Sequence, residues 1–372
     1  FRPVPPVTGT QSAPAQVAVA GTTPTLPWPA KGSAAVAVQG LGIVARNGSE
    51  EPLPIASVTK VMTAYVILTD KPLKPGEQGP SITFTAADET LYRSKLSQNE
   101  SVVPVKAGQQ LTEYQVLQGL LIPSGNNLGD ALANWDAGSV EAFVAKMNAA
   151  AKELDLKKTT YADTSGALEA SVSNPADQVV LIQKAMANPV FADIVKQPEV
   201  TLPGIGRFFN VDSVLGQDGI VGVKTGSYPT GLANFTFAAT TRVGGKDTLV
   251  FGAVFGLETL AEAFDASRAL IRAAAPAITR HRVLTAGDPV GHYDAPWGGT
   301  VNVLAPADVE MLGWPGMSAT TRVELRAIAA PAGADSPAGS LVVTLGEQRT
   351  SLDLKTSGPI PEPTKSWRLT RH

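Results

Sequence analysis

The sequence predicts an α+β protein in which an antiparallel sheet is flanked by helices, together with a mostly helical subdomain and a small C-terminal all-β domain. Three observations predict this arrangement. Strand-like runs stand early and late in residues 30–280, helix-like runs lie between them, and after about residue 281 short alternating runs are divided by Pro and Gly. We therefore expect a Pro-rich linker or tail over residues 1–29, a main domain over 30–280 and a β domain over 281–372.

The first region has the composition of a linker. Residues 2–28 are rich in Pro, Thr, Gly and Ala. The chain begins at Phe1, and no apolar run of 18 or more residues is present in it. We therefore expect that a signal peptide or membrane anchor precedes the sequence, and that any membrane contact is made only through that segment. The alternative is the disordered tail of a soluble protein.

The main domain is predicted to open with a hairpin. Residues 34–46 form two strand-like runs on either side of Gly40-Leu41-Gly42. Residues 57–68 are apolar on nearly every side, which is typical of a helix buried in the centre of a domain rather than lying on its surface. We therefore expect a central helix over residues 57–68.

The middle of the main domain is predicted to be helical. Residues 111–122 indicate a helix in which Thr112 and Gln115 form a capping box, and Pro123 stops it. A second helical stretch follows over residues 128–135.

The late part of the main domain predicts a meander followed by a helix that covers the sheet. The expected strands are residues 219–226, 234–242 and 247–255, and the expected helix is 260–275. Beyond it, the expected strands of the β domain are residues 300–304, 322–329, 340–345 and 350–354.

Three short motifs occur in order within this framework: Ser57-Val58-Thr59-Lys60, Ser124-Gly125-Asn126 and Lys224-Thr225-Gly226. The first pattern, S-x-x-K, is expected about once by chance in a chain of this length, and alone it means little. Here it occurs once, and its companions follow at the separations expected of one active site. The set indicates an acyl-transferring serine enzyme.

The spacing of the first motif suits a nucleophile and its base. One helical turn takes about 3.6 residues, so Ser57 and Lys60 lie side by side on a helix. An ordinary lysine is protonated at neutral pH, but burial and a second cation, Lys224, would lower its pKa by about 3 or more in a fully buried setting. The alternative is a lysine that extends from the apolar helix to solvent.

The second motif lies at a helix junction. Ser124 and Asn126 follow Pro123 in a tight turn, from which two polar side chains can point into a cleft. Ordinary helix capping is the alternative. The similar Ser97-Gln98-Asn99 lies in a polar stretch without a strong helix on either side, and we interpret it as a surface turn.

The third motif ends a strand. Lys224 and Thr225 at a strand edge can bind a substrate carboxylate, and a backbone N–H just beyond Gly226 can bind an oxyanion. A turn after a strand is the alternative interpretation.

The composition excludes several other kinds of site. Cysteine is absent, which removes thiol catalysis and disulfides, and His281, His292 and His372 all follow the last motif. A Ser-His-Asp triad within the main domain and a typical zinc site are therefore not expected, and no metal or organic cofactor is required. A net charge of -3 without a basic run gives no support for nucleic-acid binding.

The motifs resemble those of D-alanyl-D-alanine carboxypeptidases, the low-molecular-mass penicillin-binding proteins of the serine β-lactamase and penicillin-binding-protein superfamily. Three further segments share the resemblance, which covers roughly residues 30–280: Ile55 to Tyr65, Met147-Asn148 and Asp163-Thr164-Ser165-Gly166. It implies a β-lactamase/transpeptidase-like fold. It also implies that Ser57 is the acylated nucleophile, Lys60 its base and Ser124 a proton relay. Asn126 would donate a hydrogen bond to the peptide backbone of the substrate, and Lys224, Thr225 and Gly226 would bind its carboxylate end. The backbone N–H groups of Ser57 and Ser227 would form the oxyanion hole that completes substrate binding.

The resemblance further implies a hydrolase of the cell wall. Its substrate would be a peptidoglycan stem peptide ending in D-Ala-D-Ala, its covalent inhibitors would be β-lactam antibiotics, and its location would be extracytoplasmic, in the cell envelope. The β domain would serve spacing or partner contact.

Some positions depart from the family pattern. Asn127 stands where many relatives carry Asp, Ser227 replaces a frequent His, and Tyr228-Pro229-Thr230-Gly231 is an unusual continuation. We keep three alternatives: a β-lactamase, for which Glu169 is a weak candidate base, a D,D-transpeptidase, and a non-catalytic protein that binds cell-wall peptides.

Overall fold

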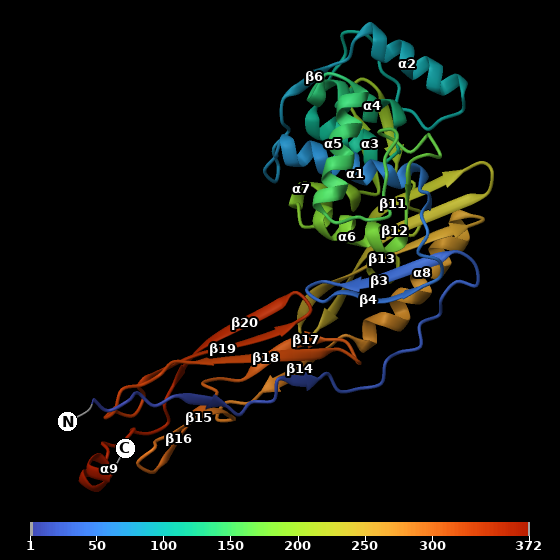
Figure 1. The fold of residues 1–372 in the computed structure, drawn as a ribbon. Helices are drawn as coiled ribbons and strands as arrows, with labels where there is room; N and C mark the ends of the chain where they lie inside the picture. The colour runs from blue at the N-terminus through green and yellow to red at the C-terminus, as the bar shows by residue number, and fades with distance from the viewer. Residues whose placement is uncertain (1–2, 371–372) are drawn as a thin grey trace. The chain divides into compact units, whose positions relative to one another are not determined.

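The computed structural model describes residues 3–370 and divides into two compact units (Figure 1). One unit covers residues 25–275, and the other is formed by the chain up to residue 24 and from residue 276 onward. The first two residues of the expected linker and His372 lie outside the described residues.

The larger unit contains a five-stranded antiparallel sheet (Figure 1). Its strand order is β11-β12-β13-β3-β4, so β13 joins the late meander to the early hairpin through pairs such as Val250 with Val38. The predicted hairpin and meander are both present. The strands are β3 (Ser33–Val38), β4 (Gly42–Asn47), β11 (Ile220–Tyr228), β12 (Leu232–Val243) and β13 (Lys246–Leu257).

Helices cover both faces of this sheet, as predicted. α8 (Leu260–Ala274) packs on β12 and β13, and the ring of Phe264 meets that of Phe235 edge-on with centroids 4.9 Å apart. α6 (Pro175–Met186) packs on β13 and β3, where Ala35 and Phe251 join the core of the helical subdomain.

The helical subdomain is built around α1 (Lys60–Asp70), in which residues 60–64 are each 0 % exposed. The predicted capping box is confirmed: Thr112 and Gln115 exchange hydrogen bonds at the start of α3 (Glu113–Leu121). The other elements are α2 (Ala86–Ser97), α4 (Asn126–Ala137), α5 (Val140–Glu153), α7 (Pro189–Val195) and the strand pairs β5 (Leu53–Pro54) with β8 (Val172–Ser173), β6 (Ser81–Thr83) with β7 (Gln110–Thr112), and β9 (Glu199–Leu202) with β10 (Gly206–Phe209).

Helix α2 corrects one expectation. Ser97, Gln98 and Asn99 are exposed, as predicted, but Ser97 is the last residue of a twelve-residue helix, and the turn consists of Gln98 and Asn99. Thr85 and Asp88 cap this helix with a reciprocal pair of hydrogen bonds. None of its side chains is fully buried, so it lacks the apolar stripe by which we recognised the other helices.

The smaller unit is rich in strands, as predicted for the C-terminal region, but it begins earlier in the chain than expected. β1 (Gly9–Gln11) pairs with β15 and β2 (Gln16–Ala18) pairs with β18, so residues 3–24 differ from the linker that their composition predicts. Strands of three residues are too short to show a period, and Pro and Thr are tolerated at sheet edges. The remaining elements are β14 (Thr279–Leu284), β15 (Pro289–Asp294), β16 (Thr300–Leu304), β17 (Val309–Gly313), β18 (Ser318–Leu325), β19 (Pro337–Leu345), β20 (Gln348–Lys355) and α9 (Lys365–Thr370).

A search of residues 3–370 for a helix of the length and apolar character needed to span a bilayer finds none.

Candidate active site

The first motif places a serine against a buried lysine. Ser57 lies in a 3₁₀ turn, Ala56–Thr59, that runs directly into α1, so it precedes the α-helix rather than opening it. Lys60 is the first residue of α1, and its Nζ lies 2.7 Å from Ser57 Oγ. The same Nζ donates to the carbonyl oxygen of Ser165 at 2.8 Å. Lys60 is 0 % exposed, so it does not extend to solvent.

Burial changes the protonation of Lys60. Desolvation is the largest effect and lowers its pKa well below the usual 10.5, and the charge of Lys224 lowers it further. The carboxylate of Asp163 acts in the opposite direction. A neutral amine within hydrogen-bond distance of Ser57 can accept the hydroxyl proton.

The second motif is held in an unusual backbone conformation. Ser124 has φ of 66°, in the left-handed region, between α3 and α4, and it is 4 % exposed. Asn126 begins α4 but its side chain does not cap the helix, so ordinary capping does not explain the motif. Within residues 3–370, Ser124 Oγ and Asn126 Oδ1 are buried without a hydrogen-bond partner. Such atoms are costly unless something binds them.

The neighbouring Asn127 has a structural role. Its Oδ1 accepts from the backbone N–H of Val103 and its Nδ2 donates to the Val103 carbonyl, both at 2.9 Å. An aspartate has no hydrogen to donate to that carbonyl. This departure from the family pattern therefore secures the segment that precedes the second motif.

The third motif lies on β11, at one edge of the five-stranded sheet. Lys224 is 2 % exposed, and desolvation lowers its pKa to about 7, while the carboxylate of Asp212 opposes that shift. Its Nζ donates to the carbonyl of Thr225 at 3.2 Å. Lys224 and Thr225 are therefore polar groups in a largely dry environment.

Gly226 brings the third motif to the first. A Cβ at this position would lie closer than 3.0 Å to the carbonyl oxygen of Ile55 and 3.1 Å from the backbone nitrogen of Val58. Strand β11 thus packs directly on the turn that carries Ser57, and only glycine allows this approach. Ser227 follows at an exposed position.

The unusual continuation after Ser227 also has a structural explanation. The Tyr228 hydroxyl donates to the carbonyl oxygen of Gly166 at 2.8 Å. A Cβ on Gly166 would overlap the carbonyl of Ala56. The end of β11, the loop around Gly166 and the nucleophile turn are therefore packed together.

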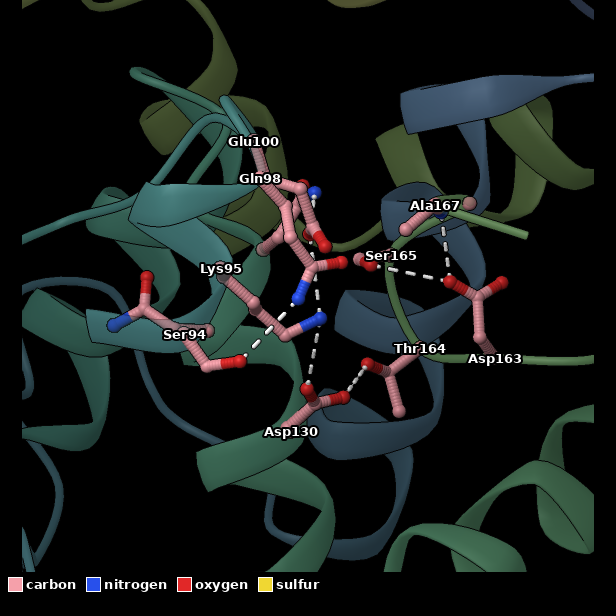
Figure 2. Close-up of polar contacts among 12 residues, drawn as sticks. Ser94, Lys95, Gln98, Glu100, Asp130, Asp163, Thr164, Ser165 and Ala167 are labelled. Carbon is pink, nitrogen blue, oxygen red and sulfur yellow. Dashed lines mark hydrogen bonds and ion pairs between the residues drawn. The ribbon is translucent and has the colours of Figure 1, made fainter. Parts of the chain in front are cut away.

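This loop was only partly recognised in the sequence. Asp163 accepts from the Ser165 hydroxyl at 3.1 Å and from the Ala167 N–H at 2.7 Å (Figure 2). It also accepts from the Ser171 hydroxyl at 2.5 Å. These bonds hold the loop whose Ser165 carbonyl accepts from Lys60. Asp163-Thr164-Ser165-Gly166 contributed to the resemblance, but no local pattern predicted that a backbone oxygen would contact Lys60.

Two charged residues of the site were not predicted at all. Glu100 Oε2 accepts from Asn126 Nδ2 at 2.6 Å, and Lys95 lies 3.3 Å from the same carboxylate. Neither belongs to a motif. In the described part of the chain, no group of three or more His, Asp or Glu residues is placed to hold a metal ion.

Comparison with known proteins identifies the class of enzyme. The family model described as D-alanyl-D-alanine carboxypeptidase matches residues 28–257, which contain all three motifs. The chain belongs to this family. It is 33% identical to D-alanyl-D-alanine carboxypeptidase DacB2 of Mycobacterium tuberculosis over 252 residues, which are 65% of this chain and 80% of that protein. It is 30% identical to DacC of Escherichia coli over 234 residues, 62% of this chain and 57% of that protein.

Solved structures agree with this assignment. The Streptomyces K15 DD-transpeptidase matches with a TM-score of 0.59 and 27% identity, over 68% of this chain and 98% of its own. Penicillin-binding protein 5 of Haemophilus influenzae matches with a TM-score of 0.66 over 92% of this chain and 100% of its own; at 20% identity it shows the fold alone. The predicted family, the α+β fold and the assignment as a serine-type hydrolase are confirmed.

Proposed function

We propose that this member of the D-alanyl-D-alanine carboxypeptidase family removes the terminal D-alanine of peptidoglycan stem peptides through an acyl-enzyme on Ser57. The observation that carries the proposal is the 2.7 Å contact between Ser57 Oγ and the Nζ of the fully buried Lys60. The family match and the names of the relatives support the D-Ala-D-Ala substrate and acylation by penicillins.

In the first step, Ser57 Oγ forms a bond to the carbonyl carbon that precedes the terminal D-alanine, and its proton passes to the neutral amine of Lys60. The negative charge that develops on the carbonyl oxygen is bound by the backbone N–H groups of Ser57 and Ser227. The carbon–nitrogen bond then breaks, and the leaving amine takes a proton relayed through the Ser124 hydroxyl. Free D-alanine departs and the acyl group stays on Ser57.

In the second step, water replaces the amine. Lys60 takes a proton from the water, the ester bond to Ser57 breaks, and Ser57 Oγ recovers its proton. A penicillin follows the same first step, but its ring nitrogen stays attached to the acyl group, so no small product leaves and hydrolysis is slow.

Substrate binding is assigned to the remaining motif residues. Lys224, when protonated, and the Thr225 hydroxyl bind the terminal carboxylate, since both residues are buried and the bond found for Lys224 Nζ among the described residues goes to a backbone carbonyl. Gly226 lets β11 approach the nucleophile turn. Asn126 binds the peptide backbone, for which its Oδ1 offers an unpaired acceptor.

The test is labelling with penicillin. Protein incubated with a labelled penicillin should gain one adduct on Ser57, found by peptide mass spectrometry, and Ser57→Ala should gain none. D-alanine release from a peptide ending in D-Ala-D-Ala is then measured with the same pair of proteins. If the folded wild type forms no adduct and releases no D-alanine, the chain is instead a non-catalytic peptide-binding protein.

Transfer to an amine is a second candidate, because a solved neighbour at 27% identity is a DD-transpeptidase. Adding an amino-acid acceptor during turnover distinguishes the two reactions, since only transpeptidation yields the new peptide. The β-lactamase alternative has little support: Glu169 is exposed, and no hydrogen bond joins it to Ser57 or Lys60 in the described structure.

The matched family and relatives are named D-alanyl-D-alanine carboxypeptidases. Because the substrate proposed above belongs to peptidoglycan, we also propose an extracytoplasmic location for this chain.

A further inference from the structure

Lys95, near the end of α2, joins two carboxylates, each of which accepts a hydrogen bond from a further residue near the proposed site. Its Nζ lies 3.3 Å from Glu100 Oε2 and 3.3 Å from Asp130 Oδ2 (Figure 2). All three side chains are less than one-fifth exposed: 13% for Lys95, 18% for Glu100 and 12% for Asp130. At this depth an ion pair is screened less by solvent than a surface pair.

The ion pair between Lys95 and Glu100 extends to Asn126 of the second motif. Glu100 Oε2 accepts from Asn126 Nδ2 at 2.6 Å. A carboxylate at neutral pH only accepts hydrogen bonds, so it selects the orientation of the amide and turns Oδ1 away from Glu100. Oδ1 is the atom that remains without a partner in residues 3–370.

The ion pair between Lys95 and Asp130 extends to the segment whose Ser165 carbonyl contacts the proposed base, Lys60. Asp130 accepts from the Thr164 hydroxyl at 2.5 Å, and the carbonyl of Thr164 accepts from Thr63 at 2.6 Å. The next carbonyl along the chain, that of Ser165, accepts from Lys60 Nζ. Burial raises the pKa of Asp130, and the charge of Lys95 is the largest effect that opposes this shift.

We propose that Lys95 is a positioning residue that holds the Asn126 amide, through Glu100, and the Thr164–Ser165 carbonyls, through Asp130, in one arrangement. The inference rests on the proposed function, because the geometry that it maintains is that of acylation at Ser57. Lys95 lies outside the three motifs, and its charge makes only a smaller contribution to the lowered pKa of Lys60. Without it, Glu100 and Asp130 are two partly buried carboxylates with no shared cation, and they separate or bind solvent.

The experiment compares Lys95→Met, which keeps the length of the side chain and removes its charge, with Lys95→Arg, which restores the charge. Lys146→Met is the matched control, because Lys146 also bridges two carboxylates, Asp70 at 2.8 Å and Asp136 at 2.6 Å. The measured quantity is the second-order rate constant of acylation by a reporter penicillin. We expect a loss of about 10- to 100-fold for Lys95→Met, consistent with the cost of small misplacements at an active site. Lys95→Arg should recover most of the rate, and Lys146→Met should stay within about threefold of wild type.

A second measurement does not depend on acylation. The side-chain amide of Asn126, assigned by comparison with Asn126→Ala in the ¹H–¹⁵N spectrum, should shift in Lys95→Met and in Glu100→Gln but not in Lys146→Met. Glu100→Gln keeps the volume of the side chain and stands in for Lys95→Met if that variant does not fold. An unchanged amide signal in Lys95→Met, or equal acylation losses in Lys95→Met and Lys146→Met, would overturn the inference. A wild type that is not acylated would refute the proposed function alone, and the amide signal would still decide this inference.

Discussion

Substituting Gly226 by alanine should disable acylation by a purely steric effect. The new methyl would lie closer than 3.0 Å to the Ile55 carbonyl oxygen, whereas ordinary contacts begin at 3.4 Å. It would also meet the backbone nitrogen of Val58 at 3.1 Å. Both neighbours are backbone atoms on either side of Ser57, so the relief must come from moving the nucleophile turn away from β11 by roughly half an ångström to one ångström.

A displacement of that size has a measurable cost. Misplacing a reacting group by about 1 Å lowers a rate by about 100-fold, and overpacking costs about 1–3 kcal/mol of stability. For a domain of this size, about 1 kcal/mol corresponds to about 2–4 °C in Tm. We therefore expect Gly226→Ala to lower the penicillin acylation rate by about 100-fold and Tm by several degrees.

The assay pairs stopped-flow acylation with thermal unfolding followed by circular dichroism. Gly333→Ala is the matched control, because a Cβ there meets nothing within 4 Å and the glycine does not require a left-handed conformation. The reasoning fails if Gly226→Ala keeps its acylation rate within twofold of the control, since β11 would then not press on the nucleophile turn.

Three further predictions concern charge and the loop around Gly166. The acylation rate should fall about tenfold per pH unit once the pH drops below the lowered pKa of Lys60, because the protonated amine cannot accept the Ser57 proton. A rate that stays constant down to the pH at which the protein unfolds would contradict this. KM for a peptide with a free terminal carboxylate should rise as the pH exceeds about 7, where Lys224 loses its charge. Asp212→Asn should move that rise to lower pH, since Asp212 raises the pKa of Lys224. The check is kcat/KM measured against pH for wild type and Asp212→Asn, and identical profiles would exclude an influence of Asp212 on Lys224. Tyr228→Phe should cost about 1 kcal/mol by removing the 2.8 Å bond to the Gly166 carbonyl, measured as a lower Tm; an unchanged Tm would show that this bond contributes nothing.

Local patterns in the sequence predicted the elements that they encode directly. The capping box at Thr112 and Gln115, the meander joined through Gly244-Gly245 and the hairpin at Gly40 depend on neighbouring residues, and all are present. By contrast, α2 and the first two strands depend on partners elsewhere in the chain: β1 pairs with β15, and its Gln11 lies opposite Gly291. No local period reveals such pairing.

For the site as well, the sequence predicted contacts between near neighbours and missed those between distant segments. Motif spacing places Ser57 next to Lys60, but it cannot decide whether a lysine in an apolar helix is buried or reaches solvent. That depends on the Ser165 carbonyl, about a hundred residues later, which accepts from Nζ. Lys95 and Glu100 were missed for the same reason, because charged residues at the end of an exposed helix resemble an ordinary solvated surface.

The backbone at the nucleophile links packing to chemistry. Ala56, directly before Ser57, has φ of 48°, a conformation that costs a non-glycine residue about 1–3 kcal/mol. Gly166 lies so close to the Ala56 carbonyl that a Cβ would overlap it. A Cβ on Gly226 would likewise lie closer than 3.0 Å to the carbonyl oxygen of Ile55. The turn is thus held between β11 and the Asp163 loop, and this close packing excludes solvent from the start of α1. Because desolvation is the largest effect on the pKa of Lys60, the packing around Ala56 also lowers that pKa and holds the amine next to Ser57.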